Sequence, residues 1–142
     1  MDVLPEAQAM LVLRTDFSRQ DAWEAVRAAI GVSGTGGFVE EYMDEVRVLE
    51  DAAYQDLAPQ DILALVPDGY ENSILVVVDE TTTASAELPL LVIDLVEEHG
   101  RTMRVIPAEL PSIQANLSIA NMDFSEFADN VDDDGVFRGF PD

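Results

Sequence analysis

Five short runs of aliphatic residues recur along the chain and predict the strands of a sheet. They cover residues 9–14, 45–49, 73–78, 90–96 and 102–106. The run at 73–78 is apolar at every position after its serine, which is typical of a central strand covered on both faces. The run at 45–49 alternates polar and apolar residues, which predicts a strand with one wet face.

Helical spacing of apolar residues marks the segments between and after these strands. Residues 19–30 carry apolar side chains three and four positions apart, and Trp23 on this stripe is expected to anchor the core. Three further helices are predicted over 59–66, over 109–117 and after Asp123, where Glu126 completes a capping box.

This order of elements predicts an α/β or α+β fold. We expect one domain over residues 1–142, with a mixed five-stranded sheet covered by about four helices. The short connections among the last three strands predict an antiparallel meander in the second half of the sheet. A chain of 142 residues is long enough to bury a core of this kind.

Composition removes many functions. The chain has 29 acidic residues, 7 basic ones and no cysteine, so its formal net charge is −22. All seven basic residues are arginines. Direct binding to nucleic acid or to an anionic membrane is disfavoured, because both need clustered positive charge. The absence of cysteine excludes thiol catalysis and cysteine metal sites. No apolar run is long enough to span a bilayer and no signal peptide is recognised, which predicts a cytoplasmic protein.

The negative charge is concentrated in the middle of the chain. Between Arg47 and Arg101 there are twelve acidic residues and no lysine or arginine. A strong negative field suits a basic protein partner, although charge can also serve solubility alone. The acids taken as candidates for such a contact are Glu50, Asp51, Asp56, Asp61, Glu97 and Glu98.

Two groups of oxygen side chains are candidate metal ligands. Asp16, Asp79 and Asp94 lie at or near strand ends, and three such carboxylates would suit magnesium or calcium if the sheet brought them together. Asn130, Asp132 and Asp134 match the first positions of a calcium loop, but Pro141 stands where a full loop needs a glutamate.

Other familiar motifs are incomplete, so no cofactor is expected. Residues 74–80 resemble a Walker B strand, but no phosphate-binding loop with a lysine accompanies it. The glycines at 31–37 follow a predicted helix and lack the full dinucleotide-binding pattern. His99 is the single histidine, with no G-x-S-x-G elbow or cysteine to serve, and is expected to be an exposed turn residue.

Five segments of the sequence together carry a resemblance to a known protein family. They lie at residues 13–17, 64–68, 101–105, 116–124 and 134–140, and the last two are the most specific. With these segments the chain resembles a family of small acidic actinobacterial proteins classed as a domain of unknown function. The resemblance implies a single intracellular domain and supplies no activity, substrate or catalytic residue.

The sequence therefore leaves three functional hypotheses. The first is a non-catalytic module that docks on a basic protein partner, in the manner of an immunity or inhibitor protein. The second is an enzyme dependent on a divalent metal held by the strand-end carboxylates. The third is a nucleic-acid mimic whose carboxylates stand in for phosphates. The oligomeric state stays open.

Overall fold

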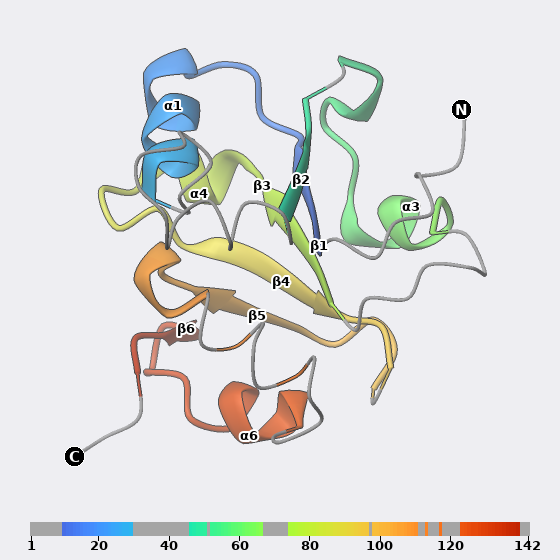
Figure 1. Cartoon of the computed structure of the whole chain (residues 1–142), viewed down its shortest axis with the longest axis vertical. Coiled ribbons are helices and arrows are strands. Elements are labelled where there is room, and N and C mark those ends of the chain that lie inside the picture. Colours follow the sequence, from blue (N-terminus) through green and yellow to red (C-terminus); the bar gives the residue numbers. More distant parts are fainter. Residues whose placement is uncertain are drawn as a thin grey trace.

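Six strands form one mixed sheet in the computed structural model (Figure 1), in the order β2-β1-β3-β4-β5-β6. The structure describes residues 10–29, 46–50, 52–66, 74–96, 98–110, 113, 117 and 123–139. The strands are β1 (Met10–Arg14), β2 (Val46–Leu49), β3 (Ile74–Val78), β4 (Leu90–Asp94), β5 (Thr102–Val105) and β6 (Val136–Phe137). The five predicted strands are confirmed, and the two-residue β6 extends the sheet beyond them.

The two halves of the sheet follow different pairing rules. β1 pairs in parallel with both β2 and β3, whereas β3, β4 and β5 pair antiparallel. The predicted meander is therefore confirmed. Parallel neighbours need long crossovers, and the chain supplies them between β1 and β2 and between β2 and β3. β6 returns to β5 in parallel, with Val136 opposite Arg104.

Four described helices accompany the strands: α1 (Gln20–Ala29), α3 (Pro59–Leu63), α4 (Glu80–Ala84) and α6 (Phe124–Ala128). Two 3-10 turns, η1 (Ala52–Tyr54) and η2 (Pro107–Glu109), complete the described elements. The predicted Asp123–Glu126 cap of α6 is present, since the Asp123 N–H donates to Glu126 Oε2 at 2.8 Å. The predicted helix over 109–117 lies mostly outside the described residues. α4 was not predicted from the sequence, because it is a short helix with polar residues at most of its positions.

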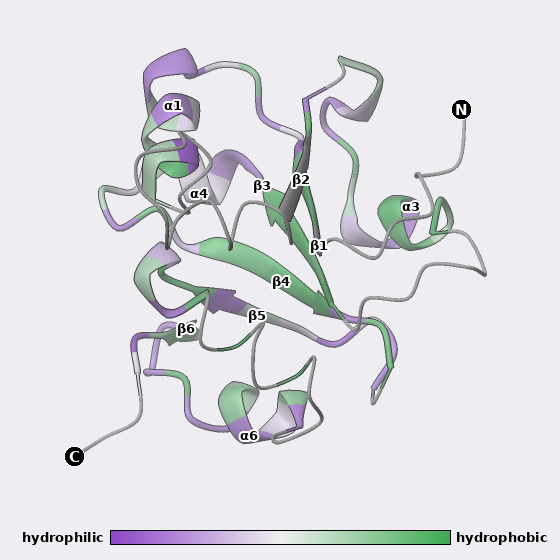
Figure 2. Cartoon of the chain, viewed as in Figure 1, coloured by the Kyte–Doolittle hydropathy of each residue, from purple (hydrophilic) through white to green (hydrophobic). Residues whose placement is uncertain are grey.

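The core has two layers, one on each face of the sheet. Alternate strand residues such as Val76 and Val92 pack on one face with Trp23 of α1 and Phe127 of α6. The intervening strand residues pack on the other face with Ile62 of α3. Because both faces are covered, β3 and β4 are buried at every position and hydrophobic along most of their length (Figure 2). Trp23 is fully buried, as predicted.

Candidate functional site

A small cleft opens at the carboxyl ends of β1 and β3. The chain leaving β1 is held there by Thr15 and Asp16, whose N–H groups both donate to the Val78 carbonyl at 3.0 and 3.3 Å. The cleft has a volume of about 220 Å³. Its lining residues are Thr15, Asp16, Asp56, Leu57, Asp79, Glu80 and Thr81.

The topology explains why a cleft forms at this point. After β1 the chain crosses through α1 on one face of the sheet, and before β3 it crosses through α3 on the other face (Figure 1). The chain thus diverges to opposite faces after β1 and after β2, and residues that follow the carboxyl ends of β1, β2 and β3 line the cleft there. Open α/β sheets bind ligands at such a switch point. This cleft is the candidate functional site.

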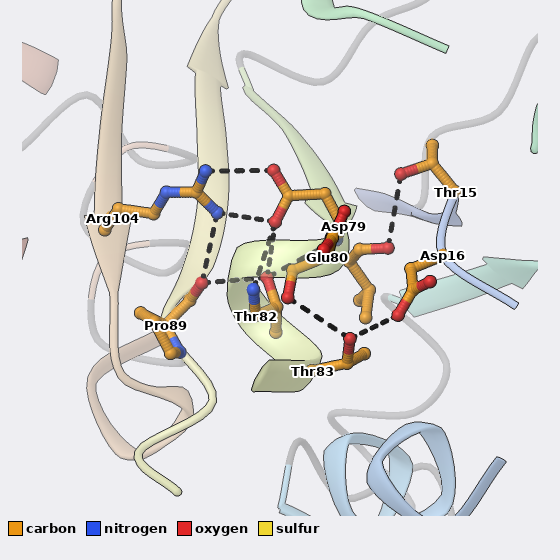
Figure 3. Close-up of polar contacts among 9 residues, drawn as sticks. Thr15, Asp16, Asp79, Glu80, Thr82, Thr83, Pro89 and Arg104 are labelled. Atoms are coloured by element: carbon orange, nitrogen blue, oxygen red, sulfur yellow. Dashed lines mark hydrogen bonds and ion pairs between the residues drawn. The ribbon is translucent and has the colours of Figure 1, made fainter. Parts of the chain in front are cut away.

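Asp79 supports the wall of the cleft. Its carboxylate caps α4 by accepting the Thr82 N–H at 3.1 Å and the Thr82 hydroxyl at 3.0 Å. It also receives two hydrogen bonds from the Arg104 guanidinium of β5, at 2.7 and 2.9 Å (Figure 3). Burial raises the pKa of Asp79, but the hydrogen bonds and charge of Arg104 outweigh it, so the pKa lies below its ordinary value.

Asp16 is the more deeply buried carboxylate of the cleft, at 8% exposed. One oxygen accepts the Ser18 N–H at 3.2 Å and the Ser18 hydroxyl at 2.7 Å, and the other accepts the hydroxyl of Thr83 (Figure 3). Burial raises the pKa of Asp16, but the hydrogen bonds from Thr83 and Ser18 and the nearby charge of Arg19 outweigh it, so the pKa lies below its ordinary value. Asp16 thus ties the end of β1 to α4.

The exposed rim of the cleft carries two more acids. Asp56 has a left-handed backbone with φ of 61°, a conformation that aspartate tolerates better than most residues. Its N–H donates to the Thr15 carbonyl at 2.9 Å, which fixes it beside the end of β1. Glu80 is exposed at the first position of α4. The cleft is therefore lined by four carboxylates, of which two are embedded in hydrogen bonds and two face solvent.

A buried arginine lies next to the cleft, and sequence reasoning missed it. Arg14 is 4% exposed and its Nε donates to the Asp16 carbonyl at 3.0 Å. Its guanidinium carbon lies 4.5 Å from the centroid of the Phe17 ring and 5.1 Å from that of Trp23. Glu50 completes the cluster, 3.8 Å from Arg14 Nη1 and accepting the Trp23 indole N–H at 2.9 Å. The one sequence feature that could have indicated Arg14 is its position as a charged residue at the end of an apolar run.

Asp94 does not join Asp16 and Asp79. It pairs with Ile74, the first residue of β3, whereas Asp79 follows the last residue of that strand. At roughly 3.3 Å per residue the two ends lie roughly 16 Å apart. Asp94 instead accepts the N–H groups of Val96 and Glu98, at 3.0 and 2.6 Å, and so shapes the turn between β4 and β5. In the described part of the chain, no three His, Cys, Asp or Glu side chains gather in a way that could hold a metal ion.

The partial calcium loop is engaged by an arginine. Asp132 Oδ2 and Asp134 Oδ2 each accept a hydrogen bond of 2.7 Å from Arg138. Asn130 points elsewhere and donates to the Glu126 carbonyl at 2.7 Å. Two of the three side chains that the sequence suggested for calcium, Asp132 and Asp134, therefore bind a guanidinium of the same chain.

The four described acids among the six proposed as partner contacts do not share one face. Glu50 binds Trp23 and Arg14, Asp61 accepts the Ala58 N–H at 3.2 Å, and Glu98 pairs with Arg101. Asp56 is exposed at the cleft, while Glu98 lies at the opposite end of the sheet. Asp51 and Glu97 lie outside the described residues. Asp56 is thus the described member of this set that lines the cleft.

Arginines of the described part are engaged within the chain. Arg14 and Arg27 approach Glu50, Arg101 binds Glu98 and Asp129, Arg104 binds Asp79, Arg138 binds three acids, and Arg19 donates to the Thr83 carbonyl. These contacts cover six of the seven arginines in the sequence. Among the described residues, Asp56, Glu80 and Asp133 are examples of carboxylates that are exposed. His99 is exposed in a turn, as expected.

Fold and cleft together define a mixed-sheet domain with an acidic cleft at its topological switch point. The chain belongs to the DUF6924 family, described as a domain of unknown function, and the match covers residues 9–140. The family resemblance expected from the sequence is confirmed at this level. No curated protein matches the chain. Among the described residues, no helix has the length and apolar character needed to cross a membrane.

Proposed function

We propose that this protein is a non-catalytic binding module whose acidic surface docks on a basic protein partner, in the manner of an immunity or inhibitor protein. The observation that supports this proposal is that the described arginines contact groups of the same chain. The acidic residues outnumber the basic ones by 22, so the surface carries carboxylates without an arginine partner. A field of one sign attracts an oppositely charged partner and speeds its association.

The acidic cleft is the centre of the proposed contact. Asp56 and Glu80 are exposed at its rim, and Asp16 and Asp79 lie beneath them with their negative charge retained by lowered pKa values. An arginine or lysine side chain of the partner would meet the two exposed carboxylates, Asp56 and Glu80, at this point. The cleft is also concave, which offers a protruding side chain more contact than a flat surface does.

A divalent-metal enzyme is the second candidate, and the switch-point position of Asp16 and Asp79 is the observation in its favour. Against it, these carboxylates already accept hydrogen bonds from Thr83, Ser18, Thr82 and Arg104. Calorimetric titration with magnesium, manganese and calcium decides the question. Stoichiometric binding that is lost in Asp79→Asn would replace our proposal with the metal hypothesis.

Affinity capture from native lysate, with matched variants as bait, tests the binding module. One bait carries Asp56→Asn and Glu80→Gln. The control carries Glu24→Gln and Asp133→Asn, which remove the same charge from exposed positions outside the cleft. We expect wild type and control to retain one basic protein at low salt and to release it at about 0.5 M NaCl, where charge is screened within a few Å.

The cleft variant is expected to lose this partner at low salt as well. Circular dichroism of all baits confirms that each is folded. Two results contradict the proposal: the absence of any specific basic partner at either salt concentration, or equal capture by the cleft variant and the control. The second outcome would refute the cleft as the contact and leave the rest of the acidic surface as a plain solubilising feature.

A further inference from the structure

The last described segment, residues 131–139, is tied to the sheet through Arg138. The guanidinium donates to both carboxylate oxygens of Glu87, each at 2.8 Å. It also donates to Asp132 and Asp134, each at 2.7 Å. Glu87 belongs to the loop between α4 and β4, so Arg138 links two segments far apart in the sequence. We name these four residues the Arg138 latch.

Other contacts between the segment and the sheet accompany the latch, and the side chains of Val136 and Phe137 are buried, at 6% and 2% exposed. β6 has two residues, and the carbonyls of Gly135 and Phe137 accept the N–H groups of Arg104 and Ile106 at 3.1 and 3.3 Å. The Phe137 ring packs edge-on against Phe127, with centroids 5.4 Å apart. A two-residue strand at a sheet edge makes few backbone hydrogen bonds to its neighbour, so its attachment depends strongly on side-chain contacts with the residues around it.

The latch consists of exposed charges with an excess of negative sign. The side chains of Glu87, Asp132 and Asp134 are between 51% and 58% exposed, and that of Arg138 is 30% exposed. Salt therefore screens their attraction. Without the guanidinium, three carboxylates would face one another, and their repulsion would push residues 131–139 away from the loop that holds Glu87.

We propose that the Arg138 latch is a salt-sensitive device that holds β6 on the edge of β5. When the latch opens, β6 leaves and the outward backbone N–H groups of Arg104 and Ile106 become accessible, while β1 to β5 stay paired. The proposal is independent of the partner hypothesis, because it concerns an equilibrium of the isolated protein.

Residue-resolved amide exchange by NMR, on the full chain, tests this. The exchange rates of the Arg104 and Ile106 amides measure the opening of β6, because these N–H groups donate to the carbonyls of Gly135 and Phe137. The Val105 N–H points to the other side of β5, toward β4, and serves as an internal reference. In Arg138→Gln at low salt we expect the protection of Arg104 and Ile106, relative to Val105, to fall about tenfold.

The sign of the salt effect gives a sharper test. In the wild type, salt screens an attraction, so relative protection at Arg104 should fall as NaCl rises from about 0.05 to about 0.5 M. In Arg138→Gln, salt screens a repulsion, so the same ratio should rise. Adding Glu87→Gln to Arg138→Gln removes part of the repulsion and should restore part of the protection.

Arg101→Gln is the matched control, because it removes an arginine that also binds two exposed carboxylates, Glu98 and Asp129. It should leave the ratio of Arg104 to Val105 within about twofold of the wild type. The proposal is overturned if Arg138→Gln leaves that ratio unchanged. It is equally overturned if Val105 loses protection in parallel, since β6 would then open only when the whole sheet unfolds.

Discussion

Replacing Asp79 by alanine should destabilise the protein substantially. The change removes the cap of α4, which is worth about 1 kcal/mol. It also deprives Arg104 of two charge-assisted hydrogen bonds, which together are worth about 1.5–3 kcal/mol. Both side chains of the pair are about three-quarters buried, with 26% and 21% of their surface exposed, so solvent screens little of this interaction. The expected loss in the free energy of unfolding is about 2.5–4 kcal/mol.

Urea unfolding followed through the single tryptophan, Trp23, measures this loss. With a slope of about 2 kcal/mol per M, the midpoint should fall by about 1–2 M without a change of slope. Glu80→Ala is the control, because it removes the neighbouring acid at an exposed position, and it should shift stability by less than about 0.5 kcal/mol. A double-mutant cycle with Arg104→Met should give a coupling energy above about 1 kcal/mol.

Two outcomes would refute this reasoning. One is a coupling energy near zero, which would mean that the Asp79–Arg104 pair does not stabilise the fold. The other is a loss that appears only when magnesium is present and vanishes in chelator. That second result would assign Asp79 to a metal site, since a structural carboxylate stabilises the protein whether or not metal is added.

Three further predictions follow from the same contacts. The folded-state pKa of Asp79 is lowered, so the stability that its carboxylate contributes is present above the ordinary aspartate pKa and disappears as pH falls. The difference in free energy of unfolding between wild type and Asp79→Asn should therefore shrink below about pH 4. A difference that grows in acid would contradict this. Glu50→Ala frees the Trp23 indole N–H, and should change the tryptophan emission and cost about 1 kcal/mol; unchanged emission would count against the hydrogen bond. Calcium at about 1 mM should give no stoichiometric heat in calorimetry, because Arg138 already binds the loop carboxylates, and clear binding would show that calcium displaces it.

Strand identity was the most predictable feature of this fold. The runs at 73–78 and 90–96 are apolar on both faces, and residues of this kind gain most when a sheet is covered on two sides. The cap at Asp123 was equally readable, because capping depends on residues a few positions apart. By contrast α4 was missed, since Glu-Thr-Thr-Thr-Ala has no apolar stripe. Its stability depends on Asp79, Arg104 and Pro89, which come from three different segments.

The sequence predicted that aspartates form the candidate site, but it did not predict which of them come together. Asp16 and Asp79 were identified because both follow buried strands, and β1 and β3 proved to be parallel neighbours. Asp94 was grouped with them, although an antiparallel β4 carries it to the far end of the sheet. Asn130, Asp132 and Asp134 were candidate calcium ligands from a partial match to a calcium loop, because the sequence does not reveal that Arg138 folds back onto Asp132 and Asp134.

The sequence by itself determined a mixed sheet, five of its strands and a strong excess of negative charge, because these depend on local hydrophobic patterns and on composition. Only the tertiary structure decided which acids remain exposed and which are bound to arginines. That choice rests on contacts between residues as distant as Glu87 and Arg138, or Asp79 and Arg104. Such pairs form when the sheet brings separate segments together, and no spacing along the chain encodes them.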